Sequence, residues 1–188
     1  MGALLSNGSV FLHIPKTGGN WVIKVLADLG LVEKEFKEKH ADAKRARVIE
    51  PKIGIGNRFT FCFTRDPISW YESWWRYQVQ RGWTKWSYLT WHPCARMDAC
   101  SDNNFNKFIA NVIRIAPGFV SDMYSRFTVG ADYVGHQETL AACLINVLDK
   151  LRVEYDDRIK RIAPINESVI RPIKWDGDLR KQIEILEK

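Results

Sequence analysis

The order of its apolar and polar segments constrains this chain more than any other feature. Twice, a short run of strand-forming residues ends in a polar turn that opens into a helix. The first strand is expected over Gly8–His13 and its helix over Gly19–Leu29, where apolar residues recur every three or four positions. The second strand is expected over Phe59–Thr64, after which Asp66 can cap a helix and Pro67 suits its first turn. This alternation predicts an α/β fold with a mainly parallel β-sheet flanked by helices.

The rest of the chain continues the alternation. We expect a helix over Asn103–Ile115, a short strand at Tyr133–Gly135, a helix over Gln137–Leu151 and a charged helix over Asp178–Lys188. Residues 82–102 lack a clean period and are interpreted as an insertion or a lid. The 188 residues suffice for one substantial domain and are few for two, so a single domain over 1–188 is predicted. The last helix has no stop signal, so the natural chain can continue beyond it.

The net charge of the chain is +6 at pH 7. A basic protein favours anionic partners, among them nucleotides, phosphate or sulfate esters, acidic glycans and nucleic acid. No apolar run approaches the roughly 18 residues that span a bilayer. The first residues, "MGALLSNGSV", lack the basic and apolar regions of a secretory signal. We therefore expect no membrane span and a cytoplasmic location.

The four cysteines form no CxxC pair. Cys62 and Cys143 stand in apolar runs and are interpreted as buried thiols. His92, Cys94 and Cys100 offer three potential zinc ligands, but no fourth is evident and the spacing is not a recognised one, so no metal is expected. A disulfide between Cys94 and Cys100 is an alternative that would need an oxidising compartment.

The first polar turn, Pro15 to Gly19, combines the groups that hold a phosphate. The N–H groups at a helix start, with the helix dipole, form an anion site. Gly18 and Gly19 let the backbone approach the anion closely, Lys16 adds a positive charge, and Thr17 adds a hydroxyl. The Walker A order would place the lysine after its glycines, so this is not an ordinary ATPase loop. A plain tight turn with a solvated lysine is the alternative.

The second polar turn contributes an arginine. Arg65 follows the second strand, and Ser73 lies eight residues further on, inside the next helix. Because ligands of parallel sheets bind at the carboxyl ends of the strands, Arg65 and the first turn can face one crevice. An arginine fork with a serine hydroxyl suits a terminal phosphate monoester. Alternatively, Arg65 pairs with Asp66 or another acid, and Ser73 is only a helix residue.

Both turns resemble motifs of the sulfotransferases that use 3′-phosphoadenosine 5′-phosphosulfate. "HIPKTGG" resembles the 5′-phosphosulfate loop of the carbohydrate sulfotransferases, which reads (H/R)xPKTGxT/S. "FTFCFTRDPISWYES" resembles their 3′-phosphate motif, a strand that ends in R(D/N)P with a serine eight residues after the arginine. "YVGHQETLAACLINVLDKL" and "PINES" are similar to weaker features near the C-terminus of that family. The resemblance implies a sulfotransferase domain with a P-loop nucleotide-hydrolase-like fold, in which residues 82–102 lie on the acceptor side.

The resemblance also implies a reaction and a donor site. The donor would be 3′-phosphoadenosine 5′-phosphosulfate, without a metal, and the acceptor a hydroxyl or amine of a small molecule or glycan. Lys16 would steady the leaving phosphate oxygen, and Arg65 with Ser73 would grip the 3′-phosphate. Asn20 stands where the family has Thr or Ser, and its amide can still donate. The residues implied in binding the 5′ side of the donor are Pro15, Lys16, Thr17, Gly18, Gly19, Asn20 and Trp21.

A hydroxyl acceptor needs a base to take its proton. His40, in "KEKHADAKRAR", resembles the family's His-x-Thr/Ser-Ala segment, where a catalytic base is common, although Asp42 replaces the Thr or Ser. Glu33 and Glu35 are alternative bases. His40 can also be a solvated histidine, since residues 33–47 are dense in charge and are interpreted as a solvated helix or loop. His13 is interpreted as structural.

The aromatic residues point to the acceptor side. Six of the eight tryptophans lie within residues 70–91. Some must form the buried face of the helix after Pro67, and those near Trp83–Trp91 either line an acceptor groove or form a small hydrophobic cluster.

Two other classes of protein stay open. One is a P-loop kinase-like enzyme that uses ATP, and the other is a basic, aromatic nucleic-acid-binding module. The module does not account for two strand–turn–helix anion sites, so no nucleic acid is expected as a partner. A sulfotransferase that binds its donor without turnover is also open.

Overall fold

The computed structural model describes residues 1–83, 92–156, 159, 161–163 and 172–188. Contacts within the chain divide it into two compact units. The first comprises Met1–Arg65 and Arg126–Asn166, and the second comprises Asp66–Ser125 and Glu167–Lys188. The single domain expected over 1–188 stays a prediction.

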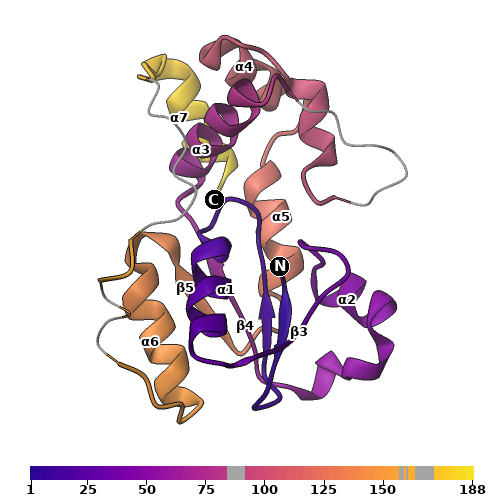
Figure 1. Ribbon diagram of the computed structural model, residues 1–188. Helices are drawn as coiled ribbons and strands as arrows, with labels where there is room; N and C mark the ends of the chain where they lie inside the picture. The colour runs from indigo at the N-terminus through magenta and orange to yellow at the C-terminus, as the bar shows by residue number, and fades with distance from the viewer. Residues whose placement is uncertain (84–91, 157–158, 160, 164–171) are drawn as a thin grey trace. The chain divides into compact units, whose positions relative to one another are not determined.

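Within the described residues, the first unit holds one five-stranded sheet in the order β3-β1-β2-β4-β5 (Figure 1). Its strands are β1 (Ala3–Leu5), β2 (Val10–Leu12), β3 (Val32–Glu35), β4 (Thr60–Thr64) and β5 (Tyr133–His136). β4 is parallel to both β2 and β5, whereas β1 is antiparallel to both β2 and β3. The α/β class is confirmed. The expectation of a mainly parallel sheet is wrong, because β1 and β3 add two antiparallel pairings.

A tight turn over residues 6–9 brings β1 into the sheet. Asn7 Oδ1 accepts hydrogen bonds from the N–H and the hydroxyl of Ser9, at 3.1 and 2.7 Å. Gly8 has a φ of 84°, a conformation that costs glycine little. Asn-Gly between two apolar runs is a hairpin signal. The turn therefore folds the N-terminal residues back along β2, in the antiparallel sense.

The charged segment 33–47 is neither one helix nor one loop. It begins in β3, whose Glu33, Lys34 and Glu35 are exposed at the edge of the sheet, where charged side chains discourage pairing with another chain. It ends in α2 (Ala43–Ile49), which Asp42 caps by accepting the N–H of Arg45 at 2.7 Å. The N–H of Phe36 donates to Gly2 O, so the chain after β3 continues beside the start of β1.

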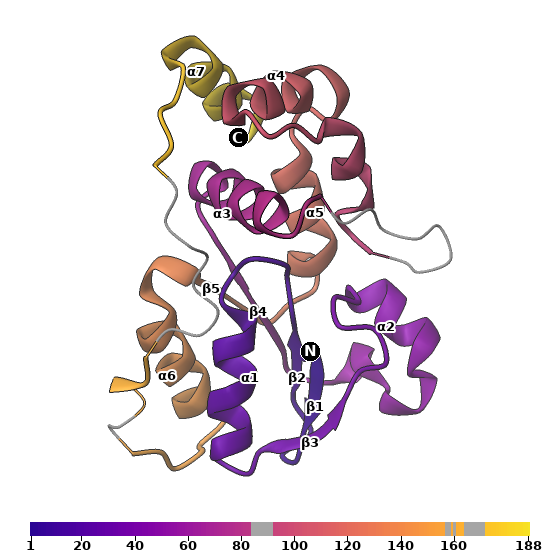
Figure 2. The same cartoon turned by 45° about the horizontal axis from the view of Figure 1, so that its top comes forward.

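Helices cover both faces of this sheet. α1 (Gly19–Asp28) and α6 (Leu140–Lys150) lie on one side of the strands, and α2 lies on the other (Figures 1 and 2). The expected apolar stripes of α1 and α6 are the faces that they bury. The described part of the unit also contains the single-turn 3₁₀ helices η1 (Pro51–Ile53), η2 (Ile55–Asn57) and η4 (Gln137–Thr139). The main core contains Phe11, Val22, Val25, Leu26, Phe61, Phe63, Leu144, Val147 and Leu148.

The second unit is helical within the described residues. It contains α3 (Pro67–Gln80), the 3₁₀ helix η3 (Ala95–Cys100), α4 (Phe105–Ile115) and α7 (Gly177–Leu186), and α5 (Phe119–Thr128) begins in it. Asp66 caps α3 as predicted, because its Oδ1 accepts the N–H of Ser69 at 2.8 Å. Trp70 and Trp74 stack with ring centroids 5.4 Å apart and are almost fully buried. These two tryptophans therefore belong to the core, whereas Trp86 and Trp91 lie outside the described residues.

All four cysteines are free thiols, and all four are buried. The interpretation of Cys62 and Cys143 as buried thiols is confirmed, and the alternative of a Cys94–Cys100 disulfide is wrong. Cys94 Sγ instead lies 3.7 Å from Met123 Sδ. Burial raises the pKa of Cys62 to about 12.

Within the described residues, no group of three or more His, Cys, Asp or Glu side chains is placed to hold a metal ion. His92, Cys94 and Cys100 therefore do not come together as a zinc site. In the same part of the chain, no helix is both long and apolar enough to cross a bilayer.

Candidate anion-binding site

The carboxyl ends of three parallel strands meet at one edge of the first unit's sheet. The register pairs Leu12 with Cys62 and Thr64 with His136, so the residues after β2, β4 and β5 follow one another along this edge. The loop from β2 to α1 and the side chain of Arg65 both begin here. The sequence analysis predicted that the residues after β2 and β4 face one crevice.

The backbone of the loop has an unusual conformation. Lys16 has a φ of 64° and Gly18 a φ of 81°, both in the left-handed region. This region is costly for a lysine, and strain of this kind is concentrated at functional sites. Gly18 precedes the first turn of α1 and accepts the N–H groups of Trp21 and Val22, at 2.9 and 3.3 Å. The N–H groups of Gly19 and Asn20 come before those donors, so α1 offers them no acceptor.

The two glycines permit close packing under this loop. A Cβ at Gly19 would stand 2.1 Å from Cδ2 of His13, and a Cβ at Gly18 would stand 2.5 Å from Cδ2 of Leu140. Thr17 is 1% exposed, and its hydroxyl donates to Ile14 O at 3.0 Å. The hydroxyl proton of Thr17 therefore closes the turn, and the backbone N–H groups are the donors left for an anion.

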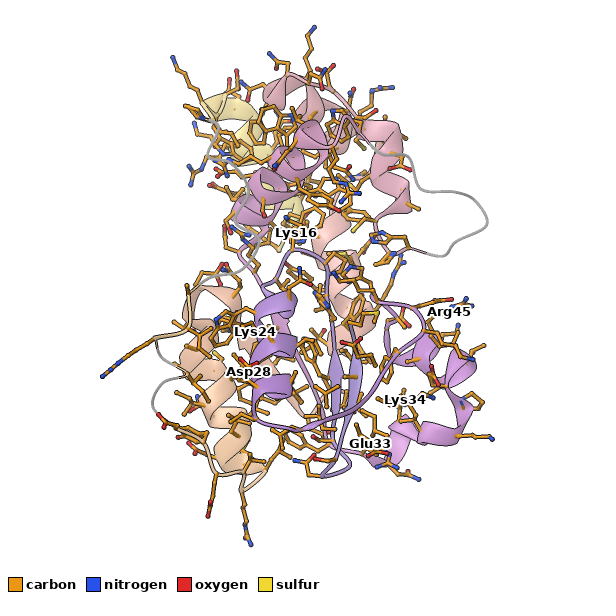
Figure 3. All side chains as sticks on the ribbon, in the orientation of Figure 1. Lys16, Lys24, Asp28, Glu33, Lys34 and Arg45 are labelled. Carbon is orange, nitrogen blue, oxygen red and sulfur yellow. The ribbon has the colours of Figure 1, made fainter. Side chains whose placement is uncertain are left out.

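Lys16 and Arg65 make this edge electropositive. Arg65 Nη1 donates to the carbonyl oxygen of Lys16 at 3.3 Å. Burial, Arg65 and Lys39, in that order, lower the pKa of the Lys16 ammonium to about 8. Each of these causes disfavours the charged lysine, and an anion beside it would reverse their effect. Figure 3 shows Lys16 in the loop at this end of the strands.

Two histidines adjoin the loop. His40 Nδ1 lies 2.9 Å from the carbonyl oxygen of His13, and the two rings meet edge-on with centroids 4.6 Å apart. Burial, followed by the charges of His40, the N-terminus and Lys39, lowers the pKa of His13 well below its usual value, so His13 is neutral. His13 is 3% exposed, and its Nδ1 has no hydrogen-bond partner among the described residues. These contacts support the interpretation of His13 as structural.

The alternative bases lie further from the loop. Glu33 is at the opposite end of the strands from Lys16 (Figure 3). Glu35 pairs with Ala3 on β1, which places it two strands from β2, about 10 Å away at the usual strand spacing. Both side chains are exposed. Of the three candidate bases, His40 is the one that contacts the strand leading into the loop.

The remaining predicted donor-site residues differ in where they lie. Pro15 is buried in the loop, and Asn20 is half-buried on the first turn of α1. The Trp21 side chain faces the core, where its Nε1 donates to Ile162 O at 3.2 Å, so it is not directed toward a ligand of the loop. Ser73 is half-buried on α3 in the second unit, and its pairing with Arg65 stays a prediction.

One further pair of side chains at this edge, Thr64 and His136, was not predicted from the sequence. Thr64 Oγ1 lies 3.3 Å from His136 Nδ1 and donates to Gly135 O at 3.2 Å. The sequence analysis did not predict that β5 pairs with β4, and this parallel pairing places His136 beside Thr64.

The fold and the site thus define an α/β protein with an electropositive strand–loop–helix junction. Comparisons with models of protein families, with curated proteins and with solved structures found no match.

Proposed function

We propose that this chain is a sulfotransferase that moves the sulfuryl group of 3′-phosphoadenosine 5′-phosphosulfate to a hydroxyl or amine of a small molecule or glycan. One observation carries the proposal: Arg65 donates to the carbonyl oxygen of Lys16, so the two motif turns meet. A donor with phosphate groups at both ends of a nucleoside needs two such cationic groups close together. The proposal includes the sulfotransferase type of P-loop fold and a cytoplasmic location.

The donor would be held mainly by the loop after β2. The N–H groups of Gly19 and Asn20 would bind the 5′-phosphate oxygens, since α1 offers them no acceptor. Lys16 would stabilise the negative charge that builds up on the leaving phosphate oxygen. Arg65, with Ser73, would bind the 3′-phosphate, the group that distinguishes this donor from ATP.

His40 would take the proton of the acceptor. Because the carbonyl of His13 can only accept a hydrogen bond, the contact at 2.9 Å places a proton on His40 Nδ1. In neutral His40 the lone pair is then on Nε2, which would receive the acceptor proton. The acceptor oxygen would form a bond to sulfur as the bond from sulfur to the 5′-phosphate oxygen breaks. The products would be the sulfate ester and adenosine 3′,5′-bisphosphate.

Titration calorimetry tests this proposal. We expect adenosine 3′,5′-bisphosphate to bind more tightly than ATP or AMP, and Arg65→Ala and Lys16→Ala each to weaken its binding tenfold or more. Lys24→Ala is the matched control, because Lys24 lies on α1 but is half exposed and pairs with Asp28 at 2.7 Å. Binding of ATP that equals or exceeds that of the bisphosphate and is unaffected by Arg65→Ala would contradict the proposal and favour the kinase class.

A further inference from the structure

A cavity lies in the first unit, at the end of the strands opposite the loop of Lys16. It has a volume of about 310 Å³, and its lining comes from α2, η2, the start of β4 and the turn before β5. Thr60, the first residue of β4, lines it, whereas Arg65 follows the last residue. Five residues of extended chain, about 16 Å, separate these two positions. The cavity is therefore distinct from the loop that contains Lys16.

Arg47 gives this cavity a positive charge that is not neutralised. Its side chain lines the cavity and is exposed, and it forms no hydrogen bond or ion pair with any described residue. Arg45, on the same helix (Figure 3), shows the contrast. Its guanidinium is bound to the carboxylate of Glu38. An arginine that lines a cavity without an acid partner can bind an anion there.

Arg58 adds a second guanidinium in a fixed position. Its Nε donates to Ile53 O, and its Nη1 donates to Gly8 O at 3.0 Å. Both acceptors are backbone carbonyls, so they hold the group in place without neutralising its charge. Nη2 of Arg58 donates to none of the described residues, which leaves its two N–H bonds for a ligand.

One acid, Asp132, also lines the cavity. Its Oδ2 accepts the N–H of Thr60 at 2.7 Å, and its own N–H donates to Thr60 O at 2.7 Å. The carboxylate is thus bound to the backbone at the start of β4. Two guanidiniums against one carboxylate leave the lining with a net positive charge.

We propose that the cavity between Arg47 and Arg58 binds the oxyanion of a phosphate or sulfate monoester. Guanidinium groups bind such oxyanions through two parallel N–H bonds. A volume of about 310 Å³ is at the lower end of the range for small-molecule sites. It suits the ester group and a small attached ring. This site does not depend on the function proposed above.

NMR titration of the ¹⁵N-labelled chain tests the site. Phenyl phosphate and phenyl sulfate are added separately at constant ionic strength, with sodium chloride as the reference, and the amide signals of the lining residues Gly56 and Gly130 are followed. We expect at least one ester to produce a saturable shift at both signals. The two titrations distinguish a phosphate ester from a sulfate ester as the preferred ligand.

Variants test whether the shifts of the amide signals depend on Arg47. Arg47→Ala should weaken binding tenfold or more. Its fold should survive, because the Arg47 side chain makes no hydrogen bond or ion pair with the described residues. Lys44→Ala is the matched control, an exposed cation of α2 outside the lining, and should leave the affinity unchanged. Lys16→Ala should also leave it unchanged. Shifts that stay linear to the highest concentration, an affinity unchanged in Arg47→Ala, or loss of the shifts in Lys16→Ala would each overturn the proposal.

Discussion

His40 Nδ1 lies 2.9 Å from the carbonyl oxygen of His13, the residue that leads from β2 into the loop of Lys16. This contact determines the tautomer of neutral His40, with the proton on Nδ1 and the lone pair on Nε2. It also connects the segment after β3 to the strand before the loop. The backbone carbonyl of His13 thus helps to hold the His40 ring in place.

His40→Ala should separate transfer from donor binding. If His40 accepts the acceptor proton, its loss should lower kcat by about 10²-fold or more, the usual contribution of a positioned base. The dissociation constant of adenosine 3′,5′-bisphosphate should change less than threefold, because His40 is not assigned to the donor. The measurements are kcat with an acceptor found by screening and calorimetry with the bisphosphate. Glu35→Gln is the control, and a loss of kcat there with His40→Ala unaffected would assign the base to β3 instead.

The affinity for the bisphosphate should fall as the pH rises through about 8. Lys16 has its pKa lowered to about 8 by burial, Arg65 and Lys39, so the free protein loses this charge above that pH. A bound anion raises the pKa again, so binding takes up a proton in this range and weakens by up to about tenfold per pH unit. Calorimetry between pH 6.5 and 9.5 measures the change. Lys16→Arg should flatten the profile, and a wild-type affinity that is constant up to pH 9.5 would contradict the assignment of Lys16.

Glu187 should contribute far more stability than Glu184, although both belong to the C-terminal helical segment. Glu187 Oε1 accepts the hydroxyl of Tyr71 at 2.5 Å, and Glu187 Oε2 accepts the N–H and hydroxyl of Ser121 at 2.7 and 2.8 Å. Glu187→Ala should therefore lower the free energy of unfolding by about 2–3 kcal/mol, since it leaves a buried phenol without its acceptor. Glu184 only pairs with Arg180 in solvent, so Glu184→Ala should cost about 0.5 kcal/mol or less. Urea denaturation measures both, and equal costs would show that the Glu187 contacts contribute nothing.

The two strand–turn–helix units could be predicted because each carries its own local signals. The apolar run before His13 and the cap at Asp66 act within a few residues, so the positions of β2, β4 and α3 follow from the sequence. The register of β2 on β4 then brings Lys16 and Arg65 together, as expected for adjacent parallel strands.

The antiparallel strands were missed for two different reasons. Asn7-Gly8 is a hairpin signal between two apolar runs and could have identified β1. β3 could not be identified in the same way, because an edge strand with three exposed, charged side chains has the composition of a solvated segment. Its pairing depends on β1, a partner distant in the sequence.

The contact of His40 with His13 depends on the same long-range pairing. After β3, Phe36 N–H donates to Gly2 O and Gly2 N–H donates to Lys39 O, at 2.8 and 3.0 Å. These bonds carry the chain past the start of β1 and bring His40 to the end of β2. A resemblance in sequence marked His40, but no local pattern could show which residue it would contact.

Gly19→Ala should destabilise the chain although alanine favours helices. Gly19 and Gly177 are each the first residue of a helix, α1 and α7. A Cβ at Gly19 would stand 2.1 Å from the ring of His13, which is almost fully buried and packs against Phe11 and His40. We expect the free energy of unfolding to fall by about 1–3 kcal/mol, as for other overpacked sites. A Cβ at Gly177 would meet no atom within 4 Å, so Gly177→Ala should be neutral or stabilising by up to about 1 kcal/mol.

A double-mutant cycle attributes this cost to the histidine ring. His13→Ala removes the atoms that the new Cβ would meet, so adding Gly19→Ala to His13→Ala should cost at least 1 kcal/mol less than adding it to the wild type. Urea denaturation of the four proteins gives the coupling. If the two changes are simply additive, or if Gly19→Ala behaves like Gly177→Ala, the close approach of Gly19 to His13 does not restrict position 19 to glycine. A confirmed coupling would mean that the buried His13 ring determines where the first turn of α1, with its N–H groups, lies.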